Sequence, residues 1–192
     1  MRKRLVYRAD DVGYTEAFDL GIYKAFEEGI ATSADVMLDS QHVTTALQWL
    51  KERPWVSVGW HRHLGERPVL PPEEVPSLVN EEGRFKWGHR KAYLMEEATY
   101  EDAYKEFMAE AELCKEYLGH YPDVAGVRVS ELPLEKAYAD VVNELGIVTN
   151  YFTTAPRRIP AAHGRQPMIK KARGNTVVLT QTRRRLQTAS IE

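Results

Sequence analysis

Short apolar runs alternate along this chain with longer segments in which apolar residues recur at helical spacing. The short runs are typical of strands, and the longer segments are typical of helices that cover a sheet. Strands that alternate with helices in this way usually run parallel, so the pattern predicts an α/β fold. The predicted strands are 4–9, 34–38, 55–61, 124–129, 147–152 and 176–180, and the predicted helices lie between Thr15 and Gly29 and at 43–50, 100–118 and 134–145.

The segment from Leu64 to about Ala98 breaks this regularity, because prolines and glycines interrupt every potential element in it. Long irregular segments inside compact domains are often lids or binding loops. The aromatic side chains of this one suit the faces of sugars; they are Phe85, Trp87, His89 and Tyr93. We therefore predict an inserted substrate loop at about 64–98, with Trp87 and His89 as substrate contacts. A loop packed on itself by the same aromatics is the alternative.

The number of predicted strands leaves two architectures open. Five or six strands in βα order fit a distorted or incomplete (β/α) barrel, since a complete barrel typically needs about 250 residues. An open doubly wound sheet is the competing architecture. No repeat, low-complexity tract or linker divides the 192 residues, so we expect a single domain over 1–192.

Residues that could bind a metal follow two of the predicted strands. Asp10 and Asp11 end the first apolar run, and His61 and His63 end the third. In both architectures ligands bind beyond the carboxyl ends of the strands, so these side chains should converge there. One aspartate could bind an ion while its neighbour handles a proton; a capped turn before the first helix is the alternative for this pair. Asp39 falls at the same edge, although an aspartate there more often caps the following helix.

The charge balance gives no reason to expect a polyanionic partner. The chain has 26 basic and 28 acidic residues, for a net charge of −2, which argues against nucleic acid or an anionic membrane as the main partner. No window approaches the roughly eighteen apolar residues that indicate a membrane span. We expect a small, weakly charged substrate and a cytoplasmic location, and the sequence leaves a homodimer open.

Four short motifs stand out in the first third of the chain: Arg8-Ala9-Asp10-Asp11-Val12-Gly13-Tyr14, Gly21-Ile22, Gly29-Ile30-Ala31-Thr32-Ser33 and Gly59-Trp60-His61. With them, the chain resembles the YdjC-like carbohydrate deacetylases, the ChbG/HpnK group. The resemblance covers residues 5–63 and continues more loosely through 68–71, 75–79 and 83–85, where family members also have a proline-rich substrate loop. Farther along, the helix pattern and Gly146-Ile147 are similar.

The resemblance implies the distorted (β/α) barrel of the glycoside hydrolase/deacetylase class. It also implies hydrolytic removal of N-acetyl groups from amino sugars, with chitooligosaccharides as typical substrates. By this resemblance Asp10 is the general base, and Asp11 and His61 are ligands of a divalent ion, Mg or Zn. A cation suits amide hydrolysis because it polarises the carbonyl and acidifies water, and a nearby carboxylate can accept the proton. Carboxylate and imidazole ligands do not by themselves select between the two ions.

The chain departs from the family pattern at the fourth strand. Family members usually carry Asp-Ser-His-x-His there, which supplies a third protein ligand, whereas this chain reads Gly126-Val127-Arg128-Val129-Ser130-Glu131. Arg128 would place a cation beside the ion, which is unfavourable at low dielectric, so we treat it as a candidate substrate contact. His63 lies two residues after His61, on the same face of an extended strand, and could be the third ligand or contact the substrate.

The second departure concerns a late histidine, which is the general acid of the family. The late histidine of this chain is His163, in a proline-rich segment typical of an exposed loop. The chain is then either a truncated version of a longer protein or a variant without the closing strands. Two hypotheses follow: a metal-dependent carbohydrate deacetylase, or a catalytically silent relative that binds saccharide through the aromatic loop. A phosphoesterase on a similar barrel has less support, because no phosphate-cradling glycine loop is evident.

Overall fold

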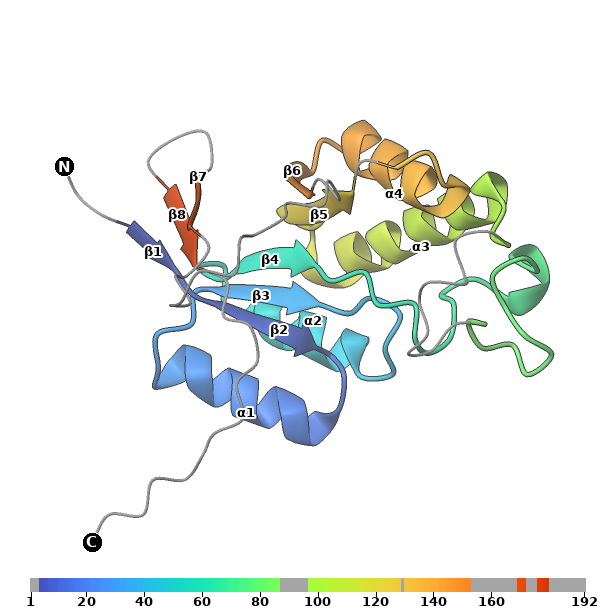
Figure 1. The fold of residues 1–192 in the computed structure, drawn as a ribbon. Coiled ribbons are helices and arrows are strands. Elements are labelled where there is room, and N and C mark those ends of the chain that lie inside the picture. The colour runs from blue at the N-terminus through green and yellow to red at the C-terminus, as the bar shows by residue number, and fades with distance from the viewer. Residues whose placement is uncertain (1–3, 87–96, 129, 153–168, 172–175, 180–192) are drawn as a thin grey trace, which may run out of the picture.

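Strands alternate with helices in the structure as the sequence pattern predicts (Figure 1). The computed structural model describes residues 4–86, 97–128, 130–152, 169–171 and 176–179. The strands are β1 (Arg4–Val6), β2 (Arg8–Val12), β3 (Ser33–Val36), β4 (Ser57–Trp60), β5 (Val124–Arg128), β6 (Val148–Phe152), β7 (Ile169–Lys171) and β8 (Thr176–Leu179), and the helices are α1 (Glu16–Glu27), α2 (Val43–Lys51), the short 3₁₀ helix η1 (Pro72–Glu74), α3 (Tyr100–Leu118) and α4 (Pro133–Glu144).

The main sheet has five parallel strands in the order β2-β3-β4-β5-β6, which is also their order along the chain. A doubly wound sheet reverses its strand order at a switch point, and the described strands show no such reversal. Sequential order is what a (β/α) barrel requires. β1, the N-terminal extension of β2, pairs in parallel with β8, and β7 pairs antiparallel to β8. The barrel-like α/β fold is therefore confirmed.

The two faces of the sheet differ in their surroundings. On β5, Ala125 and Val127 are buried, whereas Gly126 and Arg128, which point to the other face, are exposed. The buried face packs into one apolar core with side chains of all four α-helices, including Ile22, Phe26, Leu47, Phe107 and Tyr138. We call the opposite face, which carries Arg128, the inner face of the sheet. Polar side chains of the candidate site lie on this inner face.

Local capping explains why two helix starts were predictable. Thr15 accepts a hydrogen bond from the backbone N–H of Phe18 at 3.2 Å, and Thr99 accepts one from the N–H of Asp102 at 3.3 Å. α3 ends at Leu118 and is capped by Gly119, whose φ of 99° is in the left-handed region. Among the helices that the structure describes, none is long and apolar enough to cross a membrane.

The described part of the irregular segment packs against the core. Val75, Leu78 and Phe85 are buried. The backbone N–H groups of Val69 and Leu70 donate to the Glu106 carboxylate at 2.7 and 3.1 Å, which anchors the segment to α3. Phe85 is therefore a core residue, as expected for a loop packed on itself, and does not face a ligand. Trp87, His89 and Tyr93 lie outside the described residues, so the substrate loop stays a prediction.

Candidate metal centre

A β-bulge places both aspartates of the first motif inside β2. Ala9 pairs with Ala34 and Val12 with Val36, so Asp10 and Asp11 together oppose the single residue Asp35 of β3. Asp11 has a φ of 64°, in the left-handed region that residues other than glycine rarely adopt. The sequence pattern predicts that this strand ends at Ala9. In the structure it continues to Val12, so the predicted end is wrong. The bulge breaks the strict alternation of side chains at the position of the two carboxylates.

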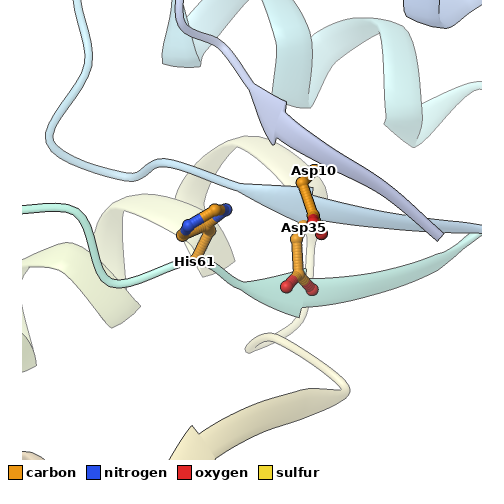
Figure 2. Close-up of side chains that lie close together, drawn as sticks. All are labelled: Asp10, Asp35 and His61. Carbon is orange, nitrogen blue, oxygen red and sulfur yellow. The ribbon is translucent and has the colours of Figure 1, made fainter. Parts of the chain in front are cut away.

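Strand register explains how Asp35 and His61 join them. Asp35 pairs with Gly59 of β4, so both residues lie on the inner face, and His61 follows two positions later on the same face. Asp10, Asp35 and His61 each bring one potential ligand atom into a group whose members lie within 4.8 Å of one another. Figure 2 shows Asp10 and Asp35 on neighbouring strands and His61 just beyond the end of β4. Two carboxylates and an imidazole are a donor set that fits a divalent ion.

Asp11 reaches His61 from the other side of the bulge. Its Oδ1 lies 3.4 Å from His61 Nδ1, and its backbone N–H donates to the same nitrogen at 3.4 Å. Nδ1 has a single lone pair, which here accepts the Asp11 N–H, so the 3.4 Å spacing is a contact between the two side chains and does not by itself indicate a shared ion. Within the described residues, Asp11 is not among the donors grouped with Asp10, Asp35 and His61. The predicted proximity of the acidic and imidazole donors is present. Their roles as ligands stay a prediction.

Asp35 is the site residue that sequence reasoning missed. The candidates that the sequence predicts lie at the ends of strands, whereas Asp35 lies inside β3, where all four residues are buried. An acidic residue inside a buried strand was the available signal, because a buried carboxylate needs a partner. The carboxylate fits because Gly59 has no side chain: a Cβ there would lie 1.9 Å from Asp35 Oδ1. The glycine of the Gly59-Trp60-His61 motif therefore makes room for this acid.

Arg8 supplies positive charge to the cluster. Its Nε lies 2.7 Å from Asp10 Oδ1, and its Nη1 lies 2.9 Å from Asp35 Oδ2. Burial raises the pKa of Asp35 to about 6; the Arg8 guanidinium opposes this shift, and the negative charges of Asp10 and Asp11 add to it. The charge of Asp35 therefore depends on pH just below neutrality.

His63 and Asp39 interact with each other at the end of the neighbouring strands. His63 Nδ1 lies 3.3 Å from Asp39 Oδ2, which also accepts the backbone N–H groups of Gly65 at 2.8 Å and Glu66 at 3.3 Å. Asp39 thus holds the segment after β4 rather than capping α2. His63 is not among the grouped donors of the described residues.

Two exposed aromatic rings lie near His63. The Tyr14 ring makes edge contacts with His63 and with Phe18, in both cases with centroids 6.2 Å apart. Tyr14 and Phe18 are both exposed. Arg128 ends β5, where it is exposed on the inner face. Trp87, His89 and His163 fall outside the part of the chain that the structure describes.

Comparison with known proteins identifies the family. Residues 4–191 match the family model described as YdjC-like protein, which is nearly the whole chain. The chain belongs to the YdjC-like family. The likeness that the sequence motifs indicated is thereby confirmed.

Curated relatives of this YdjC-like chain carry deacetylase names. A carbohydrate deacetylase of Brevibacillus brevis is 41% identical over 44% of this chain and 34% of its own length. A human carbohydrate deacetylase is 32% identical over 70% of this chain and 50% of its own length. A chitooligosaccharide deacetylase of Yersinia enterocolitica is 30% identical over 48% of this chain and 37% of its own length. The matched segments thus span about a third to a half of these relatives.

A solved structure shares the fold of this YdjC-like chain. It is the crystal structure of a candidate cellobiose-phosphate cleavage protein from Enterococcus faecalis V583, with a TM-score of 0.64 and 27% identity. The match covers 78% of this chain and 59% of that protein.

Proposed function

We propose that this chain is a metal-dependent hydrolase that removes N-acetyl groups from amino sugars or chitooligosaccharides. One observation carries the proposal: Asp10, Asp35 and His61 converge on the inner face at adjacent parallel strands, with Asp11 in contact with His61. The deacetylase names of the relatives support the reaction, and the name of the Yersinia protein supports a chitooligosaccharide as substrate.

The exposure of the acids supports a division of roles. The Asp10 side chain is 44% exposed, which suits a general base that must reach an attacking water. Asp35 is buried and Asp11 contacts His61, which suits groups that hold an ion, Mg or Zn. A divalent ion bound there would polarise the acetamide carbonyl and lower the pKa of water. Asp10 would take a proton from the water that attacks the carbonyl carbon and pass it to the amide nitrogen as the C–N bond breaks, which leaves acetate and a free amine.

The edge of the site offers surfaces for a sugar ring. The exposed rings of Tyr14 and Phe18 can cover the apolar face of a pyranose, and Arg128 can donate hydrogen bonds to hydroxyl groups. Trp87 and His89 stay proposed contacts from the substrate loop.

The test measures ion content and acetate release from chitooligosaccharides with Mg²⁺ or Zn²⁺ supplied. Asp11→Asn and His61→Ala should lose the stoichiometric ion and acetate release together, and Asp35→Asn should weaken ion binding. Asp10→Asn should keep the ion but slow acetate release by about 10²–10⁴-fold, the usual contribution of a general base. Asp140→Asn on α4 is the matched control and should behave as the unaltered chain does. Full activity of Asp11→Asn and His61→Ala would refute the proposal.

A saccharide-binding relative without hydrolysis is the second candidate. Arg8 favours this candidate because it is paired with two of the site carboxylates. Arg128 favours it as well, because it lies in the segment where family members carry a histidine ligand. Saturable binding of chitooligosaccharide, with neither a stoichiometric ion nor acetate release, would establish it in place of the hydrolase.

A further inference from the structure

Arg8 is paired with two of the carboxylates of the candidate metal centre. Its guanidinium contacts Asp10 and Asp35 at 2.7 and 2.9 Å, and these carboxylates are two of the three grouped donors. We propose that Arg8 is an internal cation that competes with the divalent ion for the Asp35 carboxylate and thereby sets the affinity of the site. This inference rests on the metal centre of the proposed function.

Competition follows from the charges. A guanidinium stays protonated at every pH that a protein tolerates, so Arg8 cannot lose its charge when an ion arrives. Two cations at one carboxylate repel each other, and the repulsion is stronger near buried Asp35 than in water. An entering ion must therefore displace Arg8 or bind against its field. Either way, the ion binds more weakly than it would without Arg8.

The same contacts explain what Arg8 does for the folded chain. Asp10, Asp11 and Asp35 lie around one bulge, where their negative charges repel one another. Arg8 offsets this repulsion. The side chain of Arg8 is 32% exposed, so the guanidinium can move toward solvent without crossing the core. On this proposal, the guanidinium of Arg8 leaves the carboxylate when the divalent ion binds.

The experiment compares ion affinities at pH 8, above the pKa of Asp35, by titrating Zn²⁺ and Mg²⁺ into the folded full chain. Arg8→Gln should bind the ion at least about tenfold more tightly, because a full charge is removed near the site. Arg8→Lys keeps the charge but not the planar two-point contact. Its affinity for the ion should therefore lie between those of Arg8→Gln and the unaltered chain. Arg53→Gln is the matched control, because Arg53 pairs with Glu27 at 2.6 Å and lies over Trp49, away from the site; its affinity should not change.

Thermal unfolding gives an independent readout. Without ion, Arg8→Gln should unfold at a lower temperature than the unaltered chain. Saturating Zn²⁺ should raise the Tm of Arg8→Gln by more than it raises the Tm of the unaltered chain. If Arg8→Gln does not fold, Arg8→Lys decides the question. An unchanged or weaker affinity in the folded variant, or no ion binding by any form, would overturn the inference.

Acetate release separates this inference from the proposed function. Tighter ion binding by Arg8→Gln without acetate release from any form would support the competition and refute the hydrolase. Acetate release with equal ion affinities in all forms would support the hydrolase and refute the competition.

Discussion

At position 59 the sheet has room for a hydrogen atom and nothing larger. Gly59 lies beside Asp35 in the register of β3 and β4, and the Asp35 carboxylate fills the space where a Cβ would be. The glycine therefore determines where the buried acid can lie. Its role is to admit a neighbouring side chain, since its φ is not in the left-handed region.

Gly59→Ala should damage both the fold and the site. The added methyl group must displace Asp35 or separate the strands, so we expect a loss of about 1–3 kcal/mol in the free energy of unfolding and weaker ion binding. Urea denaturation and Zn²⁺ titration measure the two effects. Gly21→Ala is the control, because Gly21 is in α1 with nothing within 4 Å of its Cβ position, and it should be neutral or stabilising by up to about 1 kcal/mol. Equal effects of the two substitutions would contradict this account.

At the scale of residues, sequence reasoning found only part of the candidate site. The proximity of Asp11 and His61 was predictable, because both follow apolar runs and parallel strands end at one edge. Asp35 and Arg8 were not identified. Their positions depend on strand register and on a bulge, which are set by contacts between segments far apart in the sequence.

At the scale of elements, Asp39 connects the ends of two neighbouring strands. It follows β3, and its carboxylate accepts the N–H groups of Gly65 and Glu66, which follow β4. The same oxygen lies 3.3 Å from His63 Nδ1. This one side chain therefore fixes the path of the chain just beyond His61.

Asp39→Ala should loosen the segment after β4. Two N–H groups lose their acceptor, and each partly buried group left without a partner costs about 1–3 kcal/mol. Hydrogen exchange should show faster exchange of the Gly65 and Glu66 amides. Asp39→Asn keeps an acceptor oxygen and should retain most of the protection. Unchanged exchange in Asp39→Ala would show that other contacts hold the segment.

Helix ends were predictable where a nearby side chain caps them, as at Thr15 and Thr99, because such hydrogen bonds are local. The strand at 4–9 was not placed correctly. Asp10 and Asp11 interrupt the apolar pattern although the strand continues through them to Val12.

At the scale of the whole molecule, buried acids of α3 face the sheet and the irregular segment. Burial raises the pKa of Glu106 to about 7, although the N–H groups of Val69 and Leu70 oppose the shift. Burial, with the charge of Asp39, raises the pKa of Glu110 well above its usual value, although Trp60 Nε1 donates to Glu110 at 2.8 Å. Packing in this region therefore favours protonated acids.

The free energy of unfolding should decrease as pH rises from about 5 to 8. Folding raises the pKa of Glu106 from 4.5 to about 7. Between these two pH values the folded chain therefore holds a proton that the unfolded chain has lost. Each unit of such a shift corresponds to about 1.4 kcal/mol. Urea denaturation across this pH range measures the slope. Glu110→Gln should flatten the slope, and Glu116→Gln, exposed on the same helix, should not. Stability that increases toward pH 8 would contradict the prediction.

The apolar pattern predicts the fold class but leaves the two architectures open, and the resemblance to the family is what predicted the barrel. Alternation of apolar runs and helical segments is a local property. The order β2-β3-β4-β5-β6 is a long-range property that only the pairing of strands reveals.

The bulge in β2 also limits which changes of length the chain can accept. Removing either Asp10 or Asp11 would restore regular pairing between Ala9 and Val12 and leave one acid opposite Asp35. Loss of one residue here would therefore remove a carboxylate and the bulge that orients it. The rest of the sheet would keep its register. Homologous sequences should tolerate insertions and deletions in the neighbouring turn far better than in these few positions.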